Sequence, residues 1–313
     1  MVSKSTATVA FSDYRRGRIM TCSNADIKIP VDLTNPGQFF ACCGLLEVAD
    51  RLCDAVEGWF DERLFCLSSS GCMTFDHLLT SITQLTVANT MSPGQLAKLA
   101  DFSELPKNKL TPEQEAEKKA LESQRREEPI ELSGPISLRL DWFRDGLAGG
   151  SRFKTWAGQQ SVLDIAQAMH AGISSAGIAT ESTLFEAARG MGLPFNFDSD
   201  LGGQGSALDI GFSFDPLAGS EATRIASSCR PALEFLSFLG LQRFRPCEVR
   251  GENRFIYSAW TDAQPVTVAS AIASQAVTFP ERLTFEFKLL YRTKYLKSFL
   301  PATPFRGDTN DHS

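Results

Sequence analysis

The sequence predicts an α+β fold, and three observations lead to that class. Segments in which apolar and polar residues alternate, typical of half-buried strands, are interspersed with segments of helical periodicity. The two kinds of segment do not alternate regularly, as they would in a doubly wound parallel sheet, and no repeat of fixed period occurs. The 313 residues are 43% hydrophobic and 22% charged, which is ordinary for one large elaborated domain or two smaller ones.

The first packed unit is predicted as strand, helix, strand. Residues 27–33 alternate like a strand, and the Asn35-Pro36-Gly37 triplet ends it. A helix is expected over 38–54, because apolar residues recur there at helical spacing, with Asn35 as the N-cap and Pro36 in the first turn. A second strand is expected over 63–68. This order opens a ferredoxin-like or other split β-α-β layout.

The distribution of charged and apolar residues divides the chain into five parts. We expect a polar arm over 1–26, an N-terminal α/β part over 27–103, a charged helical insertion or linker over 104–131, a C-terminal α+β part over 132–300 and a polar tail over 301–313. The insertion holds 6 Lys or Arg and 8 Asp or Glu, so it can add little to the core. Later strands are predicted at 135–143, 207–214, 253–260 and 283–290, and helices at 159–176 and 231–240.

Composition bears on location and on cofactors. The chain has no run of about 18 apolar residues, so no membrane span is expected, and its first ten residues lack the layout of a secretory signal. The eight cysteines include no C-x-x-C pair, and there are three histidines. We therefore expect buried thiols in a reducing cytoplasm, no metal site and no cofactor.

Motifs for catalysis are weak. Neither a P-loop nor a strand-linked G-x-G-x-x-G occurs. The Gly-rich stretch 201–206 is interpreted as a tight turn or as amides presented to a phosphate, and Asp198 with Asp200 as solvated acids or a cation site. His170 and His77 are interpreted as ordinary helix residues or as general bases.

The segment 151–160 interleaves cations with aromatic rings. Cations neutralise phosphates and flat rings stack on unpaired bases, so the segment predicts a nucleic-acid contact made by Arg152, Lys154, Trp156 and Gln159. The alternative is a strand that places Phe153 inside and the cations outside. Both interpretations stay open on the sequence.

A second basic segment spans 282–306. Its six cations against one acid give a local charge of +5 in a chain whose net charge is −6. The acidic total counts against a general nucleic-acid coat, but a local basic patch would bind phosphates by releasing counterions. The predicted contacts are Lys288, Arg292, Lys294 and Lys297, with a smaller basic spot at Arg243 and Arg245. A basic amphipathic surface is the alternative.

Four phrases of the sequence together resemble one protein family. DLTNPGQFFACCGLLEVADRL, RFKTWAGQQS, ALDIGFSFDP and RPALEFLSFLGLQRFRP resemble a subunit of type I-U (I-G) CRISPR systems, within the repeat-associated mysterious protein (RAMP) superfamily. The similarity runs from about residue 27 to 300, without the charged insertion. One departure is that the richest glycine loop lies at 202–205 rather than near the C-terminus, where many RAMP proteins carry one.

The resemblance implies a ferredoxin-like (RRM-like) RAMP architecture in a guide-RNA ribonucleoprotein. In such a complex, base pairing between guide RNA and target recognises the target sequence, and the protein subunits contact the nucleic-acid backbones. The expected function is a non-catalytic RNA-binding subunit of a Cascade-like complex in antiviral defence. Its partners would be the CRISPR guide RNA, other effector subunits and, as an open further partner, target DNA. Two alternatives stay open: a metal-independent endoribonuclease that processes CRISPR repeat RNA, and a protein–protein scaffold without nucleic-acid contact.

Overall fold

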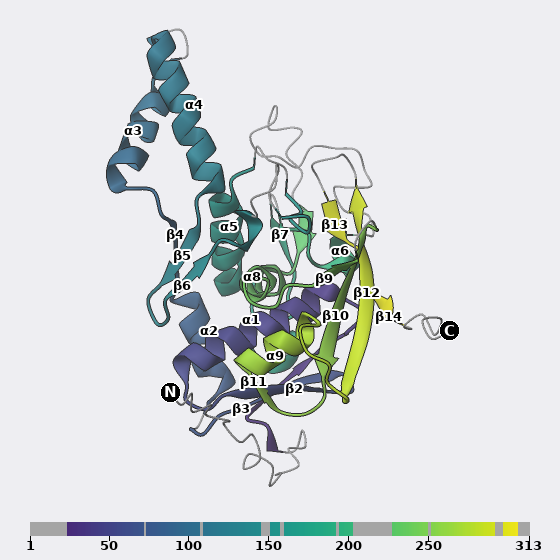
Figure 1. The fold of residues 1–313 in the computed structure, drawn as a ribbon. Helices are drawn as coiled ribbons and strands as arrows, with labels where there is room; N and C mark the ends of the chain where they lie inside the picture. The colour runs from purple at the N-terminus through teal and green to yellow at the C-terminus, as the bar shows by residue number, and fades with distance from the viewer. Residues whose placement is uncertain are drawn as a thin grey trace, which may run out of the picture.

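The fold is α+β and is built on antiparallel sheets (Figure 1). The computed structural model describes residues 24–71, 73–106, 109–144, 151–156, 160–191, 194–202, 227–249, 252–291 and 297–305. The strand predicted at 207–214 lies outside these ranges.

The first sheet contains the predicted strand-helix-strand unit. Strand β1 (Ile27–Pro30) is followed by helix α1 (Pro36–Leu52), and β2 (Glu57–Asp61) and β3 (Leu64–Ser68) form a hairpin. The strand order is β1-β3-β2-β11, with β11 (Gln264–Pro265) joining from far along the chain. All of these neighbours are antiparallel.

The close contact of two buried helices forms the centre of the molecule. Helix α8 (Pro231–Gly240) is buried along its whole length and packs on α1, which Figure 1 shows beside it. A Cβ atom added at Gly44 would lie 2.0 Å from the Leu236 carbonyl oxygen, and one at Gly240 would lie 2.1 Å from that of Phe40. The two backbones can approach this closely because neither contact residue has a side chain.

The second sheet packs against this helix pair. It comprises β9 (Cys247–Val249), β10 (Arg254–Trp260), β12 (Arg282–Tyr291), β13 (Lys297–Phe299) and β14 (Thr303–Pro304). Helix α9 (Val266–Ala273) lies against β10. The Tyr257 ring stacks on Phe39 at 4.4 Å, and the Tyr257 hydroxyl donates to the Leu33 carbonyl at 2.6 Å. These contacts tie the sheet to α1.

The third sheet, β4-β5-β6, carries a helical hairpin that extends from the body (Figure 1). Its strands are Thr86–Asn89, Ile130–Ser133 and Leu138–Leu140, with helices α2 (Phe75–Thr83) and α5 (Val162–Ser175) near it. The hairpin consists of α3 (Pro93–Glu104) and α4 (Pro112–Glu127), between β4 and β5. Leu121 is the one buried side chain that α4 contributes, in a small cluster with Met91, Leu99 and Phe102.

Short elements complete the described chain: β7 (Arg189–Met191) pairs with β8 (Ser227–Cys229), and one-turn helices lie at Trp142–Arg144, Glu181–Thr183 and Ser199–Gly202 (α6).

None of the helices in the described ranges has the length and apolar character needed to cross a bilayer. Of the cysteines in the described ranges, Cys42, Cys43, Cys66 and Cys229 are buried.

Replacing Gly240 by Ala should destabilise the fold by about 2 kcal/mol or more, because the new methyl group overlaps the Phe40 carbonyl and a packed core resists overfilling. Denaturant unfolding measures the loss. Gly94→Ala is the matched control, since no atom lies within 4 Å of its Cβ position on α3, and it should be neutral or stabilising by up to about 1 kcal/mol. Equal effects of the two substitutions would contradict the close helix contact.

Candidate nucleic-acid interface

The two basic segments predicted from the sequence meet in the fold. The Lys297 backbone N–H donates to the Thr155 carbonyl at 2.9 Å, and the Lys297 ammonium donates to the Arg152 carbonyl at 2.9 Å. Two further bonds position β13, because the Phe299 N–H and the Ser298 hydroxyl both donate to the Asn196 carbonyl. Residues 145 positions apart in the chain are therefore held side by side.

We call Arg152, Lys154 and Lys297 the basic cluster. Arg152 forms an ion pair with Glu248. Burial lowers the pKa of the Lys154 ammonium although the charge of Glu127 acts against it, and burial together with the charges of Arg152 and Lys154 lowers the pKa of Lys297. Within the described residues, neither lysine has a carboxylate in ion-pair contact. Like charges held together in a half-buried place repel, and a bound anion would relieve that repulsion.

The aromatic side chains predicted as base-stacking residues are in the core. Trp156 is 2% exposed and Phe153 7%, and Phe153 stacks on Trp142 with ring centroids 5.2 Å apart. Trp156 therefore packs as core, not as the base-stacking side chain that the alternation of cations and rings predicted. The alternative interpretation, with Phe153 inside and the cations outside, describes the segment better.

Tyr291 is the exposed aromatic ring among the described residues, with 44% of its surface accessible. It lies at the end of β12, opposite Lys297 in the strand register, and the Lys297 ammonium is 5.4 Å from its ring centroid. The sequence places Tyr291 among the cations of 282–306 but gives no sign that it, rather than Trp156, stays accessible.

Two of the other predicted contacts, Arg243 and Lys288, have surroundings other than the basic cluster. Arg243 is bound to the buried Glu47 carboxylate at 2.6 Å and shares it with Arg51, so its guanidinium is already paired within the protein. Lys288 alternates with buried Phe287 and lies on the outer face of β12, paired in register with Arg254. Arg245 is half-buried between α8 and β9. Gln159, Arg292 and Lys294 lie outside the described residues.

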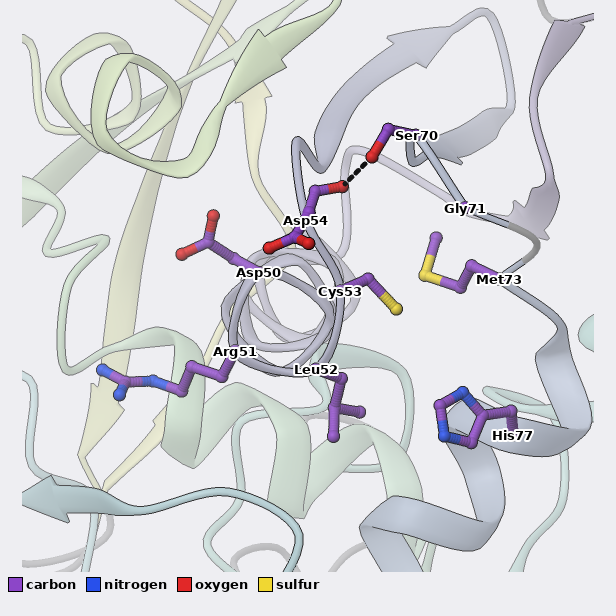
Figure 2. Close-up of a pocket in the computed structure, with 9 residues that line it drawn as sticks. All are labelled: Asp50, Arg51, Leu52, Cys53, Asp54, Ser70, Gly71, Met73 and His77. Carbon is purple, nitrogen blue, oxygen red and sulfur yellow. Dashed lines mark hydrogen bonds between the residues drawn. The ribbon is translucent and has the colours of Figure 1, made fainter.

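Both candidate histidines lie on helices. The His170 Nε2 atom is hydrogen-bonded to the Ile82 carbonyl at 2.8 Å, and its ring packs on Phe235. These contacts account for His170 as a packed helix residue. His77 is exposed on α2, where it lines an open pocket of about 370 Å³. Figure 2 shows Asp50 near the end of α1, and Cys53 and Asp54 just after that helix, at the same pocket.

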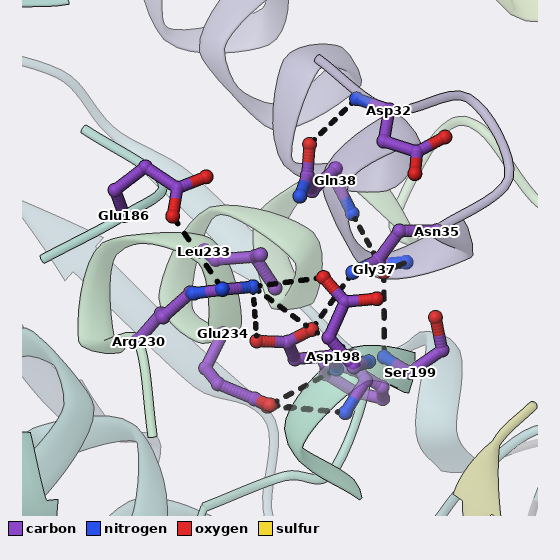
Figure 3. Close-up of polar contacts among 12 residues, drawn as sticks. Asp32, Asn35, Gly37, Gln38, Glu186, Asp198, Ser199, Arg230, Leu233 and Glu234 are labelled. Carbon is purple, nitrogen blue, oxygen red and sulfur yellow. Dashed lines mark hydrogen bonds and ion pairs between the residues drawn. The ribbon is translucent and has the colours of Figure 1, made fainter. Parts of the chain in front are cut away.

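A buried polar cluster, which the sequence did not predict, joins the start of α1 to the start of α8 (Figure 3). The Asn35 side chain caps α1 by accepting from Gly37 and Gln38, and its Nδ2 donates to Asp198 at 2.8 Å. The Glu234 carboxylate accepts from the backbone N–H groups of Phe197 and Asp198, each at 3.1 Å. Three distant segments are thus bonded together around two carboxylates that are 1% exposed.

Arg230 offsets part of the negative charge of the carboxylates in and around this cluster. Its guanidinium lies 3.2 Å from Asp198, 3.1 Å from Asp200 and 3.5 Å from Glu186. The interpretation of Asp198 and Asp200 as a cation site is therefore replaced by an ion pair with an arginine. No group of three or more His, Cys, Asp or Glu side chains is arranged to hold a metal in the ranges that the structure describes.

Burial sets the protonation of the pair of carboxylates. Burial, and then the charge of Asp198, raise the pKa of Glu234 to about 8, and burial raises the pKa of Asp198 although Arg230 acts against it. Glu234 therefore retains its proton in the folded chain at pH values where the unfolded chain has lost it.

No protein-family model matches the chain, and no curated protein matches it.

Stability should fall as pH rises from about 4.5, the ordinary pKa of Glu234, to about 8, because the folded chain then binds more protons than the unfolded chain. The slope for one such group approaches about 1.4 kcal/mol per pH unit. Glu234→Gln should flatten the slope in chemical denaturation at several pH values. Glu186→Gln is the control, because it removes an exposed carboxylate that pairs with Arg230, and it should leave the slope unchanged. An unchanged slope in Glu234→Gln would contradict the assignment.

Proposed function

We propose that this chain is a non-catalytic RNA-binding subunit of a type I-U (I-G) CRISPR effector complex. The observation that carries the proposal is the bonding of Lys297 to the backbone of residues 152–155, which gathers three cations in one place. The sequence phrases that resemble this family supply the particular system. The proposed nucleic-acid partner is the guide RNA, in the cytoplasm.

The charge balance of the basic cluster supports an anionic partner. Glu248 is ion-paired with Arg152, and the charge of Glu127 acts on Lys154 without ion-pair contact, so two carboxylates oppose three cations while burial holds the two lysines partly out of water. A half-buried ammonium interacts more strongly with a phosphate than an exposed one does, because solvent screens it less. The acidic total charge of −6 limits such binding to this local site rather than to the whole surface.

The strand order supports the ferredoxin-like part of the proposal. Strands β1, β3 and β2 are adjacent and antiparallel, with α1 linking β1 to β2, which is the split β-α-β arrangement of the ferredoxin-like layout. The sheet continues from β2 to β11, which arrives from the second half of the chain. We infer an elaborated RAMP architecture in which the helical hairpin α3–α4 is available to other effector subunits.

Lys297→Ala and Arg152→Ala should each weaken RNA binding by about tenfold. Each should also reduce the slope of log affinity against log salt concentration by about one, the value for one lost phosphate contact. The measurement is fluorescence anisotropy with labelled guide RNA at several salt concentrations. Lys288→Ala is the matched control, because this lysine is exposed on the outer face of the same sheet. Equal losses in Lys288→Ala and Lys297→Ala would refute a contact centred on the basic cluster.

Purified protein incubated with CRISPR repeat RNA in EDTA should leave the RNA intact, because the ring of His170 is engaged by a carbonyl and by Phe235. Gel electrophoresis reads the outcome. Specific cuts that disappear in His170→Ala or His77→Ala would favour the endoribonuclease instead.

A further inference from the structure

Tyr291 is held in one orientation beside the basic cluster. Its hydroxyl donates to the Asn253 side-chain oxygen at 3.0 Å, and the Asn253 amide in turn donates to the Leu289 carbonyl of the same strand at 3.3 Å. The ring is therefore fixed to β12 at both ends while 44% of its surface stays accessible. An exposed ring that is already ordered loses little conformational entropy when it stacks on a ligand.

Lys297 connects the ring to the rest of the basic cluster. Its ammonium lies 5.4 Å from the Tyr291 ring centroid and donates to the Arg152 carbonyl at 2.9 Å. One side chain thus contacts both the accessible ring and the backbone that carries Arg152. A nucleotide has a flat base and a phosphate on one sugar, and this arrangement offers a flat ring and a cation at neighbouring positions.

We propose that Tyr291 stacks on an unpaired base whose adjacent phosphate contacts Lys297 and Arg152, so that the site prefers single-stranded RNA to the same strand in a duplex. This inference rests on the proposed function and names the form of RNA that the site takes. In a duplex, each base face is covered by its neighbours, and exposing one costs free energy. Stacking on an aromatic ring is independent of base identity, because every base has a flat face, so the preference is for strand state and not for sequence.

The test compares Tyr291→Leu with Tyr291→Phe by fluorescence anisotropy, using an unstructured labelled 12-nucleotide RNA and the same strand in a duplex. Tyr291→Leu should weaken single-strand binding about fivefold or more and leave duplex binding unchanged. Tyr291→Phe keeps the ring and should stay within about twofold of the original chain. Leu283→Ala, an exposed side chain at the other end of β12, is the control and should change neither affinity.

An abasic scan locates the stacked base. Removing one base at a time from the 12-nucleotide RNA should weaken binding at particular positions in the original chain, and Tyr291→Leu should abolish that dependence. If Tyr291→Leu binds the single strand as well as the original chain while Lys297→Ala does not, the stacking role is wrong and the phosphate contact stands. If neither substitution weakens binding, both the stacking role and the proposed RNA contact are wrong.

Discussion

The close contact between α1 and α8 determines how the surrounding sheets and loops are positioned. Gly44 and Gly240 let the two backbones touch, and any larger side chain at either position would meet a carbonyl oxygen. Because α8 is buried along its whole length, its polar groups must find partners inside the protein. Glu234 finds them in the backbone N–H groups of Phe197 and Asp198.

The candidate interface follows from this bonding. The Glu234 carboxylate fixes the backbone at 197 and 198, and the neighbouring Asn196 carbonyl accepts from Phe299 and Ser298 of β13. Strand β13 then places Lys297 against Thr155 and Arg152. The basic cluster is therefore positioned by a series of backbone contacts that begins at the buried helix pair.

Local periodicity predicted much of the fold. The helix expected at 231–240 is α8 residue for residue, and the strands expected at 253–260 and 283–290 are β10 and β12 within one residue. The strand expected at 135–143 is shorter and spans Leu138–Leu140. It ends there because a one-turn helix begins at Trp142, whose indole N–H donates to the Phe238 carbonyl. No prediction covered α3 or β4, whose hydrophobic signal is weak.

The candidate site was predictable only in part, because burial is decided by contacts far apart in the chain. The basic character of 151–160 and 282–306 was visible, but Trp156 is buried by packing on Phe195 and Phe238, a fact that its neighbours in sequence do not reveal. Arg243 is likewise engaged by Glu47, 196 positions away. The sequence predicted Asp198 as a solvated acid or part of a cation site, and it gave no sign of a role for Glu234.

Ultraviolet cross-linking of the RNA-bound protein, followed by mass spectrometry of the peptides, can show whether RNA lies on the basic cluster and Tyr291. We expect cross-links within 151–156 and at Tyr291 or 297–299, because the bonds of Lys297 to Thr155 and Arg152 hold these distant parts of the chain together. Cross-links confined to the outer face of β12 or to the α3–α4 hairpin, with none at these positions, would contradict this expectation.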